Sequence, residues 1–134
     1  MSFKSKLNYR KAYKKIQDKD YDKAITYFKK SFDDYSDDLS FLYNFAYCYY
    51  QIKDYGNCIE IINKLIYLDD SYEDAFNLKA GCLVYLGKFC EALNCLNDFL
   101  KEHEGLVSSI NHKNELEALC NISRKGKIRI NIIG

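Results

Sequence analysis

Three blocks of this sequence repeat at a spacing of 34 residues, and they align without gaps. The blocks are DYDKAITYFKKSF (20–32), DYGNCIEIINKLI (54–66) and KFCEALNCLNDFL (88–100). Equivalent positions keep their character: small at Ala24, Cys58 and Ala92, and apolar at Ile25, Ile59 and Leu93. A fixed period of this length indicates supersecondary units that bury their apolar faces by stacking on their neighbours. The chain is therefore expected to be an array of similar units.

Each unit has the pattern of two helices. Residues 39–52 contain no glycine or proline and carry an apolar stripe at helical spacing, formed by Leu42, Phe45, Ala46 and Tyr49. Asp38 is a suitable N-cap for this helix. After the short turn at 53–57, a second stripe follows at Cys58, Ile62, Leu65 and Ile66. In the third unit the stripe is Phe76, Ala80 and Leu83, Ser71 with Asp74 resembles a capping box, and Gly87 fits a helix end.

The period, the Leu42–Phe45–Ala46–Tyr49 stripe and the DY-x-x-[AC]-I signature resemble tetratricopeptide repeats over roughly residues 5–104. The resemblance implies an all-α fold, a right-handed superhelical solenoid of antiparallel helix pairs with about seven helices. The first helix departs from the pattern, because Asn8 and Lys15 stand where bulky apolar residues are expected. Leu7 and Tyr9 are the alternative candidates for its buried face.

We predict a single domain over residues 1–123, with repeats at about 5–38, 39–72 and 73–106. A capping helix at about 108–123, begun by Ser108 or Ser109, would cover the last apolar layer with Leu116, Leu119 and Cys120. Gly126 would end it. Residues 124–134 are expected to be an extended or disordered tail; the alternating isoleucines at 128, 130 and 132 are a strand signal, so an arm that docks on a neighbour is the alternative to a disordered terminus.

Composition and charge limit the function. Apolar residues make up 48% and charged residues 29%, as in a soluble globular protein. The net charge of +1 divides into +7 for residues 1–30, −8 for 31–100 and +2 for 101–134. The start of the sequence has no apolar core typical of a signal peptide, so we expect a cytoplasmic protein. Its six cysteines lie in helical stretches and are expected to be buried thiols without disulfides.

No enzyme, cofactor or metal signature is present. The sequence lacks C-x-x-C, a phosphate-binding glycine loop and a serine–histidine–acid set, and its two histidines have no zinc-type spacing. We therefore predict a non-catalytic protein without cofactor or metal. Nucleic acid is a weaker candidate partner, because the acidic middle would repel phosphate although the start is basic. No apolar run is long enough to cross a membrane, so no membrane partner is expected.

A second aromatic row, Tyr43, Tyr47 and Tyr50, remains on residues 39–52 after the first stripe is buried. In the family that this chain resembles, the first helix of each unit lines a concave groove that binds peptides. Transferring that face at the 34-residue interval gives the predicted groove: Tyr9, Arg10, Tyr13, Gln17, Tyr43, Asn44, Tyr47, Tyr50, Gln51, Asn77, Leu78, Gly81, Val84 and Tyr85. Gly81 would open a hollow beside Tyr47 for an apolar anchor, or it would only let another helix pack closely. The tyrosine row would bind ligand, or pack between units, or both.

The predicted function is binding a peptide segment of a partner in this aromatic groove, as an adaptor or small chaperone. Family members that clamp the carboxylate of heat-shock chaperones carry lysine, arginine and asparagine on this face. Here Tyr9, Tyr13, Asp74 and Leu78 stand at those positions and only Asn44 matches, so a peptide with apolar anchors fits better. The alternative is a structural unit that forms homo-oligomers through its terminal helices and its Ile-rich tail.

Overall fold

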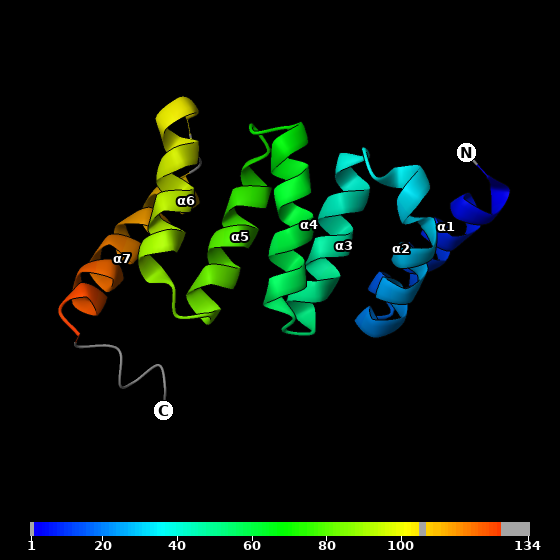
Figure 1. Cartoon of the computed structure of the whole chain (residues 1–134), viewed down its shortest axis with the longest axis horizontal. Helices are drawn as coiled ribbons and strands as arrows, with labels where there is room; N and C mark the ends of the chain where they lie inside the picture. Colours follow the sequence, from blue (N-terminus) through cyan, green and yellow to red (C-terminus); the bar gives the residue numbers. More distant parts are fainter. Residues whose placement is uncertain (1, 105–106, 127–134) are drawn as a thin grey trace. The chain divides into compact units, whose positions relative to one another are not determined.

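A computed structural model describes residues 2–104 and 107–126, and within these ranges the chain is all α-helix, without strands. Seven helices follow one another (Figure 1): α1 (Phe3–Gln17), α2 (Tyr21–Tyr35), α3 (Leu39–Gln51), α4 (Tyr55–Leu68), α5 (Glu73–Tyr85), α6 (Phe89–Glu102) and α7 (Val107–Arg124). The chain divides into two compact units between Asp69 and Asp70, so that α1–α4 belong to the first and α5–α7 to the second. The prediction of a single domain over 1–123 stays a prediction.

The three helical hairpins have the same three-residue turn. Residues 18–20, 52–54 and 86–88 connect the paired helices, and the middle residue of each turn, Lys19, Lys53 or Gly87, has a positive φ of 59°, 63° or 75°. In each turn all three backbone amides donate to carbonyls of the preceding helix, and the last two of these bonds include that from Asp54 N to Tyr49 O at 2.9 Å, which spans five residues. These last two are the bonds of a Schellman motif. The repeat therefore extends to the backbone of the turns, and the predicted helix end at Gly87 is confirmed.

The beginnings of the helices are capped mainly by aspartate. The carboxylates of Asp20, Asp38 and Asp54 accept hydrogen bonds from the amides three residues later, at 3.3, 3.0 and 3.3 Å. The predicted cap at Asp38 is confirmed. The predicted capping box at Ser71 is wrong, because α5 has Tyr72 at its N-cap and no side-chain capping bond.

Aromatic rings form the centre of the first unit. Phe28 and Phe41 are fully buried, with ring centroids 5.1 Å apart, and Phe45 stacks on Phe28 at 5.4 Å. Leu42, Ala46 and Tyr49 are buried as the stripe on α3 predicts. On α1 the buried residues are Ser5, Asn8 and Ala12. The prediction that Leu7 belongs to the buried face of α1 is wrong, since Leu7 is 37% exposed.

The second unit packs α5 on α6 and α6 on α7. Phe76 and Phe99 are buried with ring centroids 5.1 Å apart, and Leu116 and Cys120 are the buried residues of the α7 stripe. The helix begins before both predicted caps, so Ser108 and Ser109 lie within α7. The Ser109 hydroxyl is buried and bonds to Glu73 and Asn77 on α5. Gly126, with φ 76°, follows the helix as predicted, and the isoleucine pattern of the tail lies outside the described residues.

The expectation of six unbridged thiols is wrong for one pair. Cys90 on α6 and Cys120 on α7 form a disulfide, with their Cα atoms 4.8 Å apart. The two cysteines are 30 residues apart in the sequence and become adjacent only because α7 folds back on α6. Cys48, Cys58, Cys82 and Cys95 are buried thiols outside any disulfide. Burial raises the pKa of Cys48 to about 12 and that of Cys95 to about 11, so both stay protonated and unreactive near neutral pH.

Candidate functional site

The first part of the predicted groove lies on one face of α1. Tyr9, Arg10, Tyr13 and Gln17 are all predicted groove residues, and together with Lys14 they line an open hollow of about 360 Å³. Spacings of three and four residues place these side chains on neighbouring turns. Lys14 also lies 3.5 Å from the Asp18 carboxylate. The hollow therefore combines two phenol rings with two cations at the predicted place.

The two tyrosines of this hollow are held differently. Tyr9 is half-buried, and its ring lies 4.6 Å from Tyr35 and 5.0 Å from Phe41, both nearly edge-on. Burial, followed by the nearby Asp38 carboxylate, raises the pKa of Tyr9 to about 12. Tyr13 is 51% exposed. Tyr9 thus forms the fixed floor of the hollow, and Tyr13 is the ring available to a ligand.

The part of the face on α3 is aromatic and partly exposed. Tyr43, Asn44, Tyr47 and Tyr50 are half-exposed and Gln51 is exposed. The ring of Tyr47 meets Tyr21 edge-on at 6.0 Å, and Tyr50 meets Tyr55 at 5.8 Å. Burial, and then the interaction with Tyr47, raises the pKa of Tyr21. Tyr47 thus packs on α2 of the preceding hairpin and Tyr50 on α4 of its own hairpin, and each of the two rings still exposes part of its surface.

On α5, in the second unit, the predicted residues differ in exposure. Tyr85 is 64% exposed, Asn77, Gly81 and Val84 are half-exposed, and Leu78 is buried. The Asn77 amide donates to the Ser109 hydroxyl at 3.0 Å, so part of its hydrogen-bonding capacity is used within the unit. Tyr47 and Gly81 belong to different units, and the hollow predicted beside them stays a prediction.

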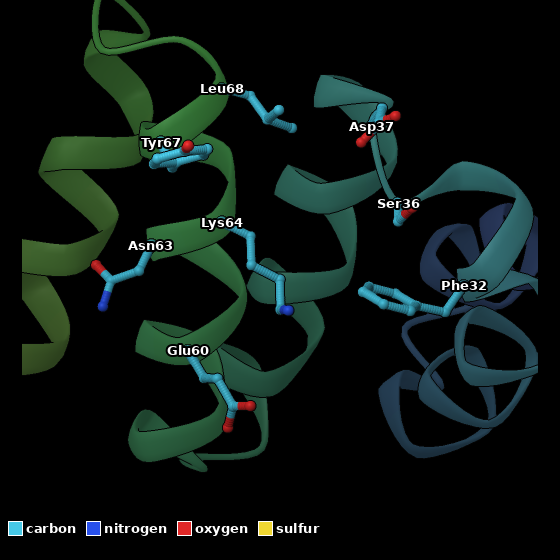
Figure 2. Close-up of a pocket in the computed structure, with 8 residues that line it drawn as sticks. All are labelled: Phe32, Ser36, Asp37, Glu60, Asn63, Lys64, Tyr67 and Leu68. Atoms are coloured by element: carbon cyan, nitrogen blue, oxygen red, sulfur yellow. The ribbon is translucent and has the colours of Figure 1, made fainter.

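Sequence reasoning missed a second hollow in the first unit, on α2 and α4. It has a volume of about 580 Å³ (Figure 2) and is lined by Phe32, Ser36, Asp37, Glu60, Asn63, Lys64, Tyr67 and Leu68. The Lys64 ammonium lies 5.6 Å from the centre of the Phe32 ring, and Tyr67 is 90% exposed. At the positions equivalent to Tyr67, the first and third repeats have the charged residues Asp33 and Lys101. The aromatic residue at this otherwise charged position was the feature of the sequence that could have indicated the second hollow.

Within the described part of the chain, no group of three or more histidine, cysteine or acidic side chains is arranged to hold a metal ion. None of the helices described here has the length and apolar character needed to cross a membrane.

Comparison with known proteins decides the family. The family model described as anaphase-promoting complex, cyclosome, subunit 3 matches residues 17–99, more than half of the chain. The chain belongs to this family. The match and the solved structures below establish the tetratricopeptide-repeat type that the 34-residue period predicted. No curated protein matches the sequence significantly.

Solved structures of the tetratricopeptide type share the fold at low sequence identity. The first such domain of Spaghetti (RPAP3), bound to the HSP90 peptide SRMEEVD, is 20% identical with a TM-score of 0.74, and the match covers 88% of this chain and 96% of that one. The second domain of human RPAP3, in complex with the HSP70 peptide SGPTIEEVD, is 19% identical with a TM-score of 0.73 over 85% and 95%. Yeast Tom70 is 21% identical with a TM-score of 0.80, covering 93% of this chain and 26% of that protein.

Proposed function

We propose that this chain is a non-catalytic interaction module, an adaptor or small chaperone of the cytoplasm, that binds a peptide segment of a partner protein. In the first unit, the proposed binding face comprises the predicted residues on α1 and α3; the predicted residues on α5 of the second unit are proposed as binding residues of that unit. The hollow on α1 supports this most strongly, because four of its five lining residues are groove positions predicted from the sequence. The peptide-bound RPAP3 domains show that relatives in fold bind peptides.

The chemistry of the face favours a particular kind of peptide. A tyrosine offers a large contact area with few torsions to order and a polar hydroxyl at its end. Arg10 and Lys14 add positive charge beside the exposed ring of Tyr13. We therefore propose a ligand with an apolar or aromatic anchor next to an acidic residue. Because Tyr9, Tyr13, Asp74 and Leu78 stand at the positions of the carboxylate clamp, we expect SRMEEVD to bind more weakly than such a peptide.

The test starts from a peptide array that includes SRMEEVD and SGPTIEEVD. For the best peptide, Tyr13→Ala and Tyr47→Ala should each weaken the affinity by about tenfold, because exposed aromatic anchors carry much of the energy of an interface. The thermal midpoint of Tyr13→Ala should change little, since its ring is half exposed. Tyr67→Ala, which removes a 90% exposed ring from α4, is the matched control.

The variants separate the proposed face from the rest of the surface. Unchanged affinity in Tyr13→Ala and Tyr47→Ala, or an equal loss in Tyr67→Ala, contradicts the proposal. If Tyr47→Ala unfolds the protein, its ring belongs to the core, and Tyr13→Ala alone carries the test.

Self-assembly is the second candidate, and the hollow on α2 and α4 favours it. Tyr67 and Leu68 expose apolar surface there, and such surface often marks an interaction site. We propose that this surface would contribute to any homo-oligomer. Light scattering over a range of concentrations should then show a rise in mean mass that Tyr67→Ala reduces; a constant monomer mass rules this function out.

A further inference from the structure

A third hollow lies between α1 and α2 of the first unit, and it occurs where the repeat pattern is broken. Asn8 is equivalent to Leu42 and Phe76 at the 34-residue interval, and Ser31 is equivalent to Leu65 and Phe99. In the other repeats these are large buried apolar residues; Phe76 and Phe99 contact each other. In the first repeat both members of the pair are small and polar, although both are buried. Less side-chain volume therefore fills the first hairpin.

Asn8, though not Ser31, lines the hollow, which has a volume of about 580 Å³ and a basic lining. Lys4 and Lys11 come from α1 and Lys30 from α2, and no carboxylate is among the lining residues. None of these three lysines makes an ion pair with a described residue. The volume falls within the range of about 300–1,000 Å³ that is common for small-molecule sites.

Two of the lysines are held at one aromatic ring. The ammonium of Lys11 lies 5.7 Å from the centre of the Tyr27 ring, and that of Lys30 lies 5.5 Å from it. The ring attracts each cation, but two like charges gathered at one ring also repel each other. An anion bound in the hollow that both lysines line would offset this repulsion.

A buried amide completes the lining. Asn8 is only 7% exposed and lines the hollow, and its side chain makes no hydrogen bond to another described residue. No buried side-chain nitrogen or oxygen of the described residues lacks a hydrogen bond, so the Asn8 amide reaches the open hollow and can donate to a ligand there.

The hydroxyls at the start of α1 have a different partner. Ser2 donates to the Asp34 carboxylate at 3.4 Å, and the hydrogen bond from Ser5 is the largest cause that lowers the pKa of Asp34. The two lining serines are thereby engaged with the exposed Asp34 carboxylate. The groups left for a ligand are three ammonium groups and one amide.

We propose that this hollow binds a phosphate monoester. Its dianionic phosphate lies among Lys4, Lys11 and Lys30, the Asn8 amide donates to a phosphate oxygen, and its organic group lies against Tyr27 and Leu7. Lysine binds phosphate as a compact point charge with several donors. A dianionic phosphate therefore complements three lysines better than a ligand with a single carboxylate does. This site lies on α1 and α2, apart from the proposed peptide face, and it does not depend on that function.

The experiment uses the full chain and phenyl phosphate as the probe, followed by NMR titration and calorimetry at low ionic strength. We expect a dissociation constant on the order of 1 mM, with shifts at Asn8, Lys11, Tyr27 and Lys30. Benzenesulfonate, a monoanion of similar shape, should bind several-fold more weakly. Equal binding of the two probes overturns the proposal, because it shows only general attraction to a basic surface.

Matched variants locate the site. Lys11→Gln and Lys30→Gln should each weaken binding by at least about fivefold. Lys29 is the control, because it is an exposed lysine on α2, the helix of Lys30, but does not line the hollow. Lys29→Gln should change the affinity by less than about twofold. Asn8→Leu restores the residue type of the second repeat and should abolish binding while keeping or raising the thermal midpoint. If Asn8→Leu binds as the original chain does, or Lys29→Gln weakens binding as much as Lys11→Gln, the site is refuted.

A capped peptide with one phosphotyrosine identifies the source of the phosphate. Binding at least about tenfold tighter than phenyl phosphate assigns the site to phosphorylated side chains, and weaker binding assigns it to free small molecules. Either result supports the hollow as a phosphate-monoester site, provided that the lysine variants lose it.

Discussion

Tyr9 and Tyr13 lie one turn apart on α1, yet their surroundings give them different roles. Tyr9 is packed against Tyr35 and Phe41, and Tyr13 is half exposed. The sequence predicted both for the groove because the two share one face of the helix. It also named Tyr9, and not Tyr13, as a candidate for the buried face of this helix, but the rings that pack on Tyr9 are on α2 and α3, elsewhere in the sequence.

The ionisation of Tyr9 predicts a loss of stability in alkali. Burial raises its pKa from 10.0 to about 12, so the folded state favours the neutral phenol. Its contribution is complete below pH 10, the pKa in the unfolded chain, and is lost as the pH rises to about 12. We expect the thermal midpoint of the natural chain to fall relative to that of Tyr9→Phe over this range. A constant difference between the two proteins would show that Tyr9 ionises normally.

At the scale of helices, α6 lacks the side-chain N-cap that α2 and α4, the second helices of the other two hairpins, have. Asp20 and Asp54 cap α2 and α4, but Lys88 stands at the equivalent position before α6 and makes no side-chain capping bond. Its backbone angles, φ −97° and ψ 66°, are close to those of Asp54 at −90° and 74°. An aspartate therefore fits there without a change in the backbone.

Lys88→Asp should raise the free energy of unfolding by about 1 kcal/mol, because the carboxylate would accept from the amide of Glu91 and interact favourably with the helix dipole. Chemical denaturation monitored by circular dichroism measures the change. Asp54→Ala, the reverse change in the second repeat, should lower the stability by a similar amount. A neutral or destabilising Lys88→Asp would mean that the cap does not form.

The helices and turns could be predicted because their causes are local. The apolar stripe on α3, the cap at Asp38 and the helix end at Gly87 depend on residues a few positions apart. The burial of Ser109 within α7 could not be predicted in this way, because it follows from contacts with Glu73 and Asn77 on α5. The basic hollow is an intermediate case: the 34-residue alignment shows the small residues at 8 and 31, but only the structure brings Lys11 and Lys30 to the Tyr27 ring.

For the whole molecule, the Cys90–Cys120 disulfide ties the last helix to the second unit. It joins α6 and α7 across 30 residues of sequence, and closing a loop of that length stabilises a fold by roughly 3 kcal/mol in the chain-entropy description. Leu116 and Cys120 form the buried contact of α7, so this helix has a small apolar area of its own. The state of the disulfide should therefore affect the second unit and leave the first unchanged.

Reduction with dithiothreitol should lower the stability of the second unit by roughly 3 kcal/mol and raise amide hydrogen exchange in α7, with little change at α1–α4. Cys90→Ser should behave as the reduced protein does and be insensitive to the reductant, while Cys82→Ser should keep the response. Titration of thiols in the denatured, unreduced protein should count four, because Cys90 and Cys120 are bonded. A count of six in protein isolated from cells under thiol-trapping conditions would contradict this prediction, because it would show that Cys90 and Cys120 are not bonded.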